Sequence, residues 1–152
     1  MEAALITSQD LAPYLEKLSE DTPAIFGDMT PQQMVEHLET IYNKAIFKGN
    51  PILISEESLP KMRAFLFSDK PIVPGFKTPM LKDGLPPYKH PTFAMAKAAL
   101  LEAADTFHSY FKANPEETTN NVSFGELNYE GWNRFFQKHN HHHFVQFGLL
   151  KG

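Results

Sequence analysis

The chain has 152 residues, of which 42% are hydrophobic and 21% charged, as expected for one globular domain spanning residues 1–152. The formal net charge is −4 and no basic stripe is present, so binding to nucleic acid is not expected. The absence of cysteine excludes disulfides, thiolate catalysis and cysteine-based zinc sites. With neither a signal peptide in residues 1–20 nor an apolar run long enough to span a membrane, a cytoplasmic protein is expected.

Two amphipathic helices are expected in the N-terminal third. The first covers about residues 8–20, where leucines share one face. The second has the clearest start, because Thr30 is a good N-cap, Pro31 suits the first helical position and Gln33 completes a capping box. Gly49 is expected to mark its end.

Two further helices are expected in the C-terminal half. The third covers about Thr92 to Ala113, with apolar residues at spacings of three and four. The fourth begins at Asn128, an N-cap candidate, and continues to about Leu150. No strand-rich region is evident. The sequence therefore predicts an all-α four-helix bundle.

A long proline-rich crossover connects the second and third of these helices. Residues 59–67 could form a short helix with Pro60 in its first turn, whereas residues 68–91 contain six prolines and two glycines. A loop of this length in a small domain is usually functional, often as a lid or pocket wall. An ordered coil packed over the bundle is the alternative interpretation.

The final helix carries a cluster of histidines. On a wheel of about 100° per residue, His139 and His143 lie in the middle of the apolar face. His142 lies at the margin of that face, and His141 points to the opposite side, where it is expected to be exposed. Neutral imidazole is the commonest protein ligand for transition metals, and residues four apart on a helix can hold one ion.

Three explanations account for two histidines on one apolar face. In the first, each is satisfied by a partner in the core; in the second, both join a polar network with tyrosine and glutamine; in the third, both bind a metal. A metal needs a further ligand, and the candidates are His37, His90, His108 or a carboxylate. His37 is the best of these, because it lies at the edge of the apolar stripe of the second helix.

Two segments carrying these histidines resemble the DinB/YfiT-like superfamily. Residues 29–38 resemble its second-helix motif, and residues 138–147 resemble a branch of small proteins that ends in His-x-x-His-His-x-x-Gln-Phe. Residues 124–132 also resemble the entry to the last helix in that branch. The chain departs from the family at residues 121–123, where His-Pro is common, and at His141, where an acidic or small residue is usual.

The resemblance implies a four-helix bundle that binds a divalent metal through one histidine of helix two and two of helix four. On this chain those residues are His37, His139 and His143. Zn, Ni or Fe would suit three nitrogen ligands, with a position left open for water or substrate. The resemblance further implies a homodimer and a metal-dependent transferase or hydrolase that activates water or a low-molecular-weight thiol towards a small electrophilic substrate. The alternative is a non-catalytic ligand-binding bundle with a polar histidine core.

Further side chains are candidates for contacting the substrate or orienting the ligands. Gln146 lies on the same helical face as His139, although it could equally satisfy groups at the helix end. No carboxylate is identified as a general acid or base. The candidates for substrate or supporting contacts are His142, Gln146, Trp132, Tyr42 and Tyr129.

Overall fold

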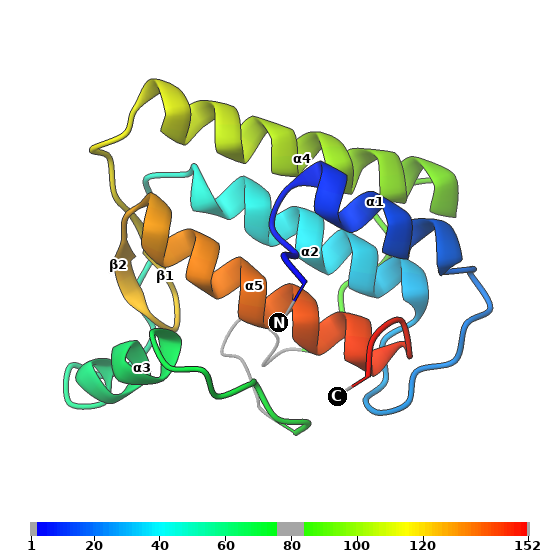
Figure 1. Ribbon diagram of the computed structural model, residues 1–152, viewed down its shortest axis with the longest axis horizontal. Coiled ribbons are helices and arrows are strands. Elements are labelled where there is room, and N and C mark those ends of the chain that lie inside the picture. Colours follow the sequence, from blue (N-terminus) through cyan, green and yellow to red (C-terminus); the bar gives the residue numbers. More distant parts are fainter. Residues whose placement is uncertain (1–2, 76–83, 152) are drawn as a thin grey trace.

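The computed structural model describes residues 3–75 and 84–151, which are mostly helical (Figure 1). In chain order the elements are α1 (Ser8–Lys17), α2 (Pro31–Ala45), α3 (Leu59–Leu66), α4 (Phe93–Ala113), β1 (Thr119–Asn121), β2 (Gly125–Leu127) and α5 (Tyr129–Gln146). Helices α1, α2, α4 and α5 lie alongside one another, while the short α3 lies apart, near the two strands (Figure 1). The four predicted helices are therefore present, with two short strands in addition.

The N-termini of α1 and α2 are fixed by reciprocal capping. In α2, the Thr30 side chain accepts a hydrogen bond from the Gln33 backbone N–H, and the Gln33 side chain accepts one from the Thr30 N–H. This confirms the predicted capping box. In α1, Thr7 and Asp10 form a second box that the sequence analysis did not identify. Each cap of this kind stabilises its helix by about 1 kcal/mol.

The core lies chiefly between α2, α4 and α5 and is rich in aromatic rings. Tyr42 stacks on Phe136 with the ring centroids 3.8 Å apart, and Phe107 packs against both rings. All three side chains are fully buried. Each buried ring of this size contributes roughly 1.5–3 kcal/mol through removal from water. The three helices are thus held at fixed distances, which sets the positions of the histidines on α2 and α5.

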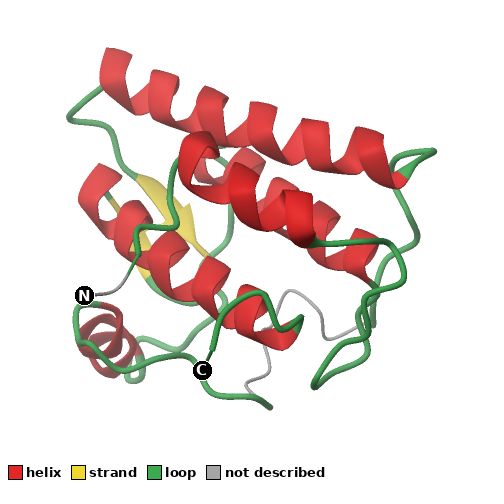
Figure 2. Ribbon diagram, turned by 45° about the vertical axis from the view of Figure 1, so that its right-hand side comes forward, coloured by secondary structure: helices red, strands yellow, loops and turns green. Residues whose placement is uncertain are grey.

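The expectation of a purely α-helical fold was wrong in one region. Strands β1 and β2 form an antiparallel hairpin, with Asn120 opposite Glu126 (Figure 2). Asn121 closes the turn, since its Oδ1 accepts hydrogen bonds from the backbone N–H groups of Ser123 and Phe124. Strands of three residues are too short to show an alternating pattern in the sequence.

Three helices end earlier than predicted. Helix α2 stops at Ala45, before Gly49, which was expected to mark its end. Helix α1 stops at Lys17 instead of residue 20, and α5 stops at Gln146 instead of Leu150. At the end of α5, Gly148 has a φ of +71°, and the backbone N–H of Leu149 bonds to the carbonyl of Phe144. This is a Schellman motif, which terminates a helix at a left-handed glycine. Gly148 was the feature of the sequence from which this end of α5 could have been predicted.

The crossover between α2 and α4 is partly described. Its short helix α3 lies at the predicted position, with Pro60 in the first turn. Residues 84–91 pack on α2, where the backbone N–H groups of Lys89 and His90 both bond to Glu36. Residues 76–83, which belong to the predicted proline-rich segment, lie outside the described residues. Among the described helices, none combines the length and apolar character needed to cross a bilayer.

Candidate metal centre

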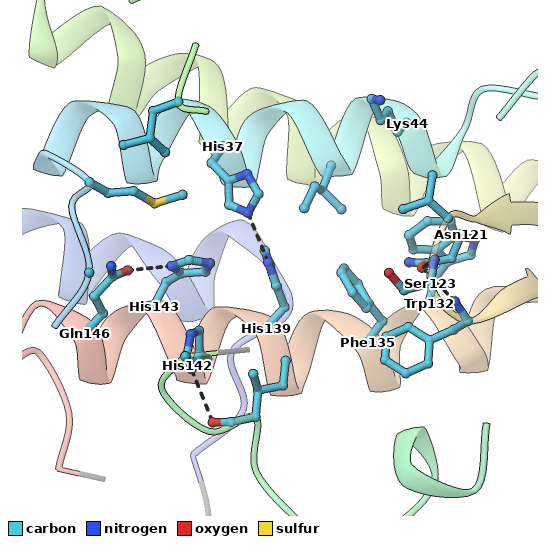
Figure 3. A pocket seen from close by; sticks show the side chains of 18 of the residues that line it. His37, Lys44, Asn121, Ser123, Trp132, Phe135, His139, His142, His143 and Gln146 are labelled. Atoms are coloured by element: carbon cyan, nitrogen blue, oxygen red, sulfur yellow. Dashed lines mark hydrogen bonds between the residues drawn. The ribbon is translucent and has the colours of Figure 1, made fainter. Parts of the chain in front are cut away.

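Three histidines from two helices meet at one point of the structure. His37 projects from α2, and His139 and His143 project from successive turns of α5 (Figure 3). One ring nitrogen from each lies within 4.8 Å of those of the other two. The centroid of the His37 ring is 5.0 Å from that of His139 and 5.1 Å from that of His143. The three residues chosen from the sequence are thus close enough to bind one metal ion.

The orientation of His143 is fixed by a chain of hydrogen bonds. The side-chain amide of Gln146 donates from Nε2 to the carbonyl of Phe26, over 3.1 Å. Its Oε1 atom therefore faces His143, whose Nδ1 lies 2.7 Å away and must be the donor. His143 consequently carries its proton on Nδ1, and its Nε2 lone pair is available. Metal-binding histidines are commonly held in this way by a hydrogen bond from the other ring nitrogen.

Gly27 gives the Gln146 amide the room that it needs. Gly27 has a φ of +77°, and a Cβ atom at this position would lie 2.9 Å from Nε2 of Gln146. Any other residue would be strained and would push the amide away from its two partners. The loop before α2 thus helps to determine how His143 is oriented.

The remaining two histidines are incompletely satisfied. Nε2 of His37 lies 3.2 Å from Nε2 of His139, so one must carry a proton or the two lone pairs repel. Nδ1 of His139 is buried and has no hydrogen-bond partner in the described structure. The residue as a whole retains partial exposure, whereas His37 and His143 are buried. Leaving a buried ring nitrogen without a partner costs free energy. The hydrogen-bond network of the histidines is therefore incomplete.

All three rings favour the neutral form. Burial, together with the nearby His142, lowers the pKa of His37 from 6.5 to about 4. Burial and the neighbouring histidines also hold the pKa of His139 and of His143 well below the usual value. Metal ions bind neutral imidazole, so these rings need not lose a proton near neutral pH before binding.

The donor set of the cluster is of the kind that a transition metal prefers. The cluster offers three imidazole nitrogens and no carboxylate, a combination that suits Zn²⁺, Ni²⁺ or Fe²⁺ more than Mg²⁺ or Ca²⁺. A self-contained polar network would also pair Nε2 of His143, for which the described residues supply no partner. The hydrogen bonds of Gln146 to His143 and to Phe26 leave Nε2 of His143 available to a ligand.

A cavity of about 820 Å³ adjoins the three histidines. Its walls come from α2, α5, the hairpin turn, residues 26–29 and both described parts of the crossover. His142, Gln146 and Trp132, three of the candidates for substrate or supporting contacts, line it. His142 is held by an interaction between its Nδ1 and the carbonyl of Ile72. The volume is in the usual range of a small-molecule site.

Two predicted site residues lie elsewhere. Tyr42 belongs to the core, where its hydroxyl donates to the carbonyl of Ile6 and accepts from Asn140. Tyr129 lies 2.6 Å from Nδ1 of His108 through its hydroxyl and packs on Phe107. Neither tyrosine lines the cavity. Both are on the correct helices, but helix periodicity alone does not distinguish a core-facing from a cavity-facing position.

The other histidines are also placed outside the cluster. His141 is half-buried, which corrects the expectation that it is exposed. His90 lies 2.8 Å from Glu39, and His108 lies between Tyr129 and the carbonyl of Ile6. None of the three lines the cavity. Among the described residues, His37 is the one of these candidates that lies with His139 and His143.

The sequence analysis missed several residues that line the cavity. Phe135 stacks on the His139 ring, with centroids 4.9 Å apart. Lys44 lies seven residues after His37 on α2, a spacing that places both on one helical face and was available from the sequence. Asn121 and Ser123 of the hairpin turn could not be foreseen, because the hairpin itself was not predicted.

Comparison of the chain with models of known protein families, with curated proteins and with solved structures finds no significant match.

Proposed function

We propose that the protein is a divalent-metal-dependent enzyme of the DinB type that transfers or hydrolyses a group on a small electrophilic substrate. The observation that carries this proposal is the meeting of His37, His139 and His143 beside a large cavity, with His143 oriented by Gln146. Three protein ligands leave at least one coordination position open, the pattern of catalytic rather than structural zinc sites. A bound ion would lower the pKa of water or of a small thiol, supplying a nucleophile that the cysteine-free chain lacks.

The residues of the chain would perform three tasks in such a reaction. The three histidines hold the metal, and Gln146 keeps the His143 ring in one tautomer. Phe135, which stacks on the His139 ring, covers one side of the histidines with apolar surface and limits the access of water. His142 lines the cavity beside His143, which makes it a candidate for contacting the substrate. The proposal includes a homodimer, which is supported only by the resemblance to the DinB/YfiT-like superfamily.

Metal content and thermal unfolding test the first part of this proposal. Tag-free protein should purify with close to one equivalent of a divalent transition metal. Chelator should lower the melting temperature, and added Zn²⁺ or Ni²⁺ should restore it, because binding to the folded state stabilises it. A protein that purifies without metal and whose melting temperature ignores both ions would contradict the proposal.

Activity assays test the second part. The metal-loaded protein should accelerate either thiol transfer to a chromogenic electrophile or hydrolysis of an activated ester, and the metal-stripped protein should accelerate neither. Activity that is unchanged by metal removal would contradict metal dependence, and the absence of activity in both forms would favour the non-catalytic bundle with a polar histidine core. The ion that restores most activity would identify the metal.

A further inference from the structure

The two ends of the cavity are formed by different parts of α5 (Figure 3). His139 lies at one end with the other two histidines, and Trp132 lies at the other end beside the hairpin turn. These two residues are seven positions apart, which is about 10 Å along the helix at 1.5 Å per residue. Phe135 lies between them and also lines the cavity. The cavity therefore extends along α5 from the histidines to the hairpin.

A row of aromatic rings begins at the histidines and forms one side of this cavity. Phe135 stacks on His139, with the ring centroids 4.9 Å apart. Phe124 meets Phe135 edge to face at 5.9 Å, and Phe65 stacks on Phe124 at 6.4 Å. All three phenylalanines line the cavity, and together we call them the phenylalanine wall. This wall offers a ligand hydrocarbon surface and no hydrogen-bonding group of its own side chains.

Several polar side chains at the hairpin end are already satisfied by the protein. The indole N–H of Trp132 donates to the hydroxyl of Thr119 over 2.8 Å. The amide of Asn50 donates to the carbonyls of Lys44 and Asn120, and the amide of Asn120 donates to the carbonyl of Asn50. These groups hold the hairpin against α2 and α5, so they are not available to bind a charged ligand.

The groups that remain do not place a charge at the phenylalanine wall. Among the described residues, the Asn121 amide N–H and the Ser123 hydroxyl have no partner, and both are neutral. Lys44 lines the cavity, but its nitrogen is turned away from the hairpin residues (Figure 3). Asp28 is exposed and belongs to the loop that contacts Gln146, at the histidine end.

The two ends therefore suit different parts of one ligand. The histidine end contains a buried ring nitrogen of His139 without a partner, which suits a polar or metal-bound group. The phenylalanine wall suits a group that gains free energy by leaving water, whereas an ionised group beside it would lose its hydration without gaining a partner.

We propose that the substrate carries an uncharged hydrocarbon group, aromatic or alkyl, that packs on Phe135, Phe124 and Phe65, while its reactive group lies at the three histidines. The position of the reactive group rests on the proposed metal-dependent function, whereas binding of the hydrocarbon does not need a metal. The substrate class is thus a hydrophobic electrophile whose polar atoms are gathered at one end.

Binding of 1-hexanol and of 1-octanol, measured by calorimetry on the protein as purified, tests for the hydrocarbon site. The two additional methylenes of octanol should raise the affinity by about tenfold, as burial of both predicts. Equal affinities for the two alcohols would overturn the inference, because they would show that the longer chain is not buried.

Octanoate and octanedioate, compared in the same way, test the requirement for an uncharged group. Octanoate can leave its single charge at the histidine end, whereas octanedioate must bring a second charge to the phenylalanine wall. Octanoate should therefore bind at least about tenfold more tightly. Octanedioate that binds as tightly as octanoate would overturn the inference.

Two variants of neighbouring residues locate the site. Phe65 is half-buried and lines the cavity, whereas Phe67 is exposed and does not line it. Phe65→Ala should weaken octanol binding by about fivefold, and the matched control Phe67→Ala should leave it unchanged. Equal effects of the two substitutions would overturn the assignment of the wall. Thermal unfolding checks that both variants fold, and the wild-type comparisons do not depend on either.

Metal content, measured on the same samples, reports separately on the proposed function. Metal-stripped protein should retain the preference for octanol over hexanol. Loss of metal binding with this preference intact would contradict the metal-dependent function alone. Loss of the preference in protein that binds metal would contradict the hydrocarbon site alone.

Discussion

Glu36 and His37 are neighbours on α2, yet the polar clusters around them differ in one decisive respect. The Glu36 carboxylate accepts three hydrogen bonds, from the backbone N–H groups of Lys89 and His90 and from the side chain of Gln32. Its cluster is complete and attaches the crossover to the helix. The His37 cluster contains a buried nitrogen of His139 without a partner and lies beside a cavity.

This difference separates a structural polar cluster from a candidate functional one. Burial by itself would raise the pKa of Glu36, but hydrogen bonds from Gln32 and from the two backbone groups lower the pKa below its usual value. Among the three histidines, only His143 receives a hydrogen bond that opposes the effect of burial, from Gln146, and burial lowers the pKa of His37 to about 4. A group that the fold satisfies stabilises the fold, whereas groups left unsatisfied beside a cavity remain available to a ligand.

The largest expected effect is the loss of metal binding on removal of a ligand. His143→Ala should weaken metal affinity by on the order of 1,000-fold, beyond the ~10–100-fold that losing an outer hydrogen-bond partner costs. His141→Ala, two residues away and outside the cavity, should leave the affinity within about threefold. Competition with a chromogenic chelator measures both. Equal losses in the two variants would contradict the assignment of ligands.

Acid should destabilise the metal-free protein before it affects the Glu36 cluster. His37 binds a proton with a pKa near 6.5 in the unfolded chain and about 4 in the folded one. Between these two pH values the unfolded state binds more protons than the folded state. As the pH is lowered from 6.5 to 4, the free energy of unfolding therefore falls by about 1.4 kcal/mol per pH unit, or roughly 3 kcal/mol in total. His139 and His143 act in the same direction.

Denaturant titrations of the metal-free protein at several pH values measure this effect. His37→Gln should make the decline between about pH 6.5 and 4 shallower. The lowered pKa of Glu36 makes its contribution disappear only as the pH falls below the usual range of a carboxyl group. Stability that is independent of pH across the histidine range would show that the rings are not buried as described.

Removing the Glu36 carboxylate should lower the free energy of unfolding and leave the metal affinity unchanged. Glu36→Ala leaves the N–H groups of Lys89 and His90 without their acceptor and should cost about 2 kcal/mol of unfolding free energy. Glu102→Ala, at an exposed position of α4, is the matched control and should change it by less than about 0.5 kcal/mol. Chemical unfolding measures the loss. A large fall in metal affinity with unchanged stability would reverse the proposed roles of the two clusters.

The smallest effect concerns the support of His143. Gln146→Leu removes the acceptor for the Nδ1 proton and should weaken metal binding by about tenfold. Gln146→Glu retains an acceptor and should recover most of the affinity. The same chelator competition distinguishes the two variants. Identical affinities in the leucine variant and the wild type would show that Gln146 does not support metal binding.

Much of the fold and the ligand set could be predicted because the signals are local. The capping box at Thr30 and Gln33 sets the start of α2 within four residues of chain. The spacing of His139 and His143 places them on one face of α5 through the helical period alone. The hairpin was missed because three-residue strands lack a periodic signal, and Gly148, which ends α5, was overlooked.

By itself, therefore, the sequence determined the helices, their capped starts and the pair of histidines on α5, since each depends on residues a few positions apart. Only the tertiary structure decided which polar groups are satisfied. Tyr42 bonds to the carbonyl of Ile6 and faces the core, while Gln146 reaches Phe26 and orients His143. Lys44 shares a cavity with the hairpin turn. These contacts join distant segments, and the packing of α2, α4 and α5 selects them.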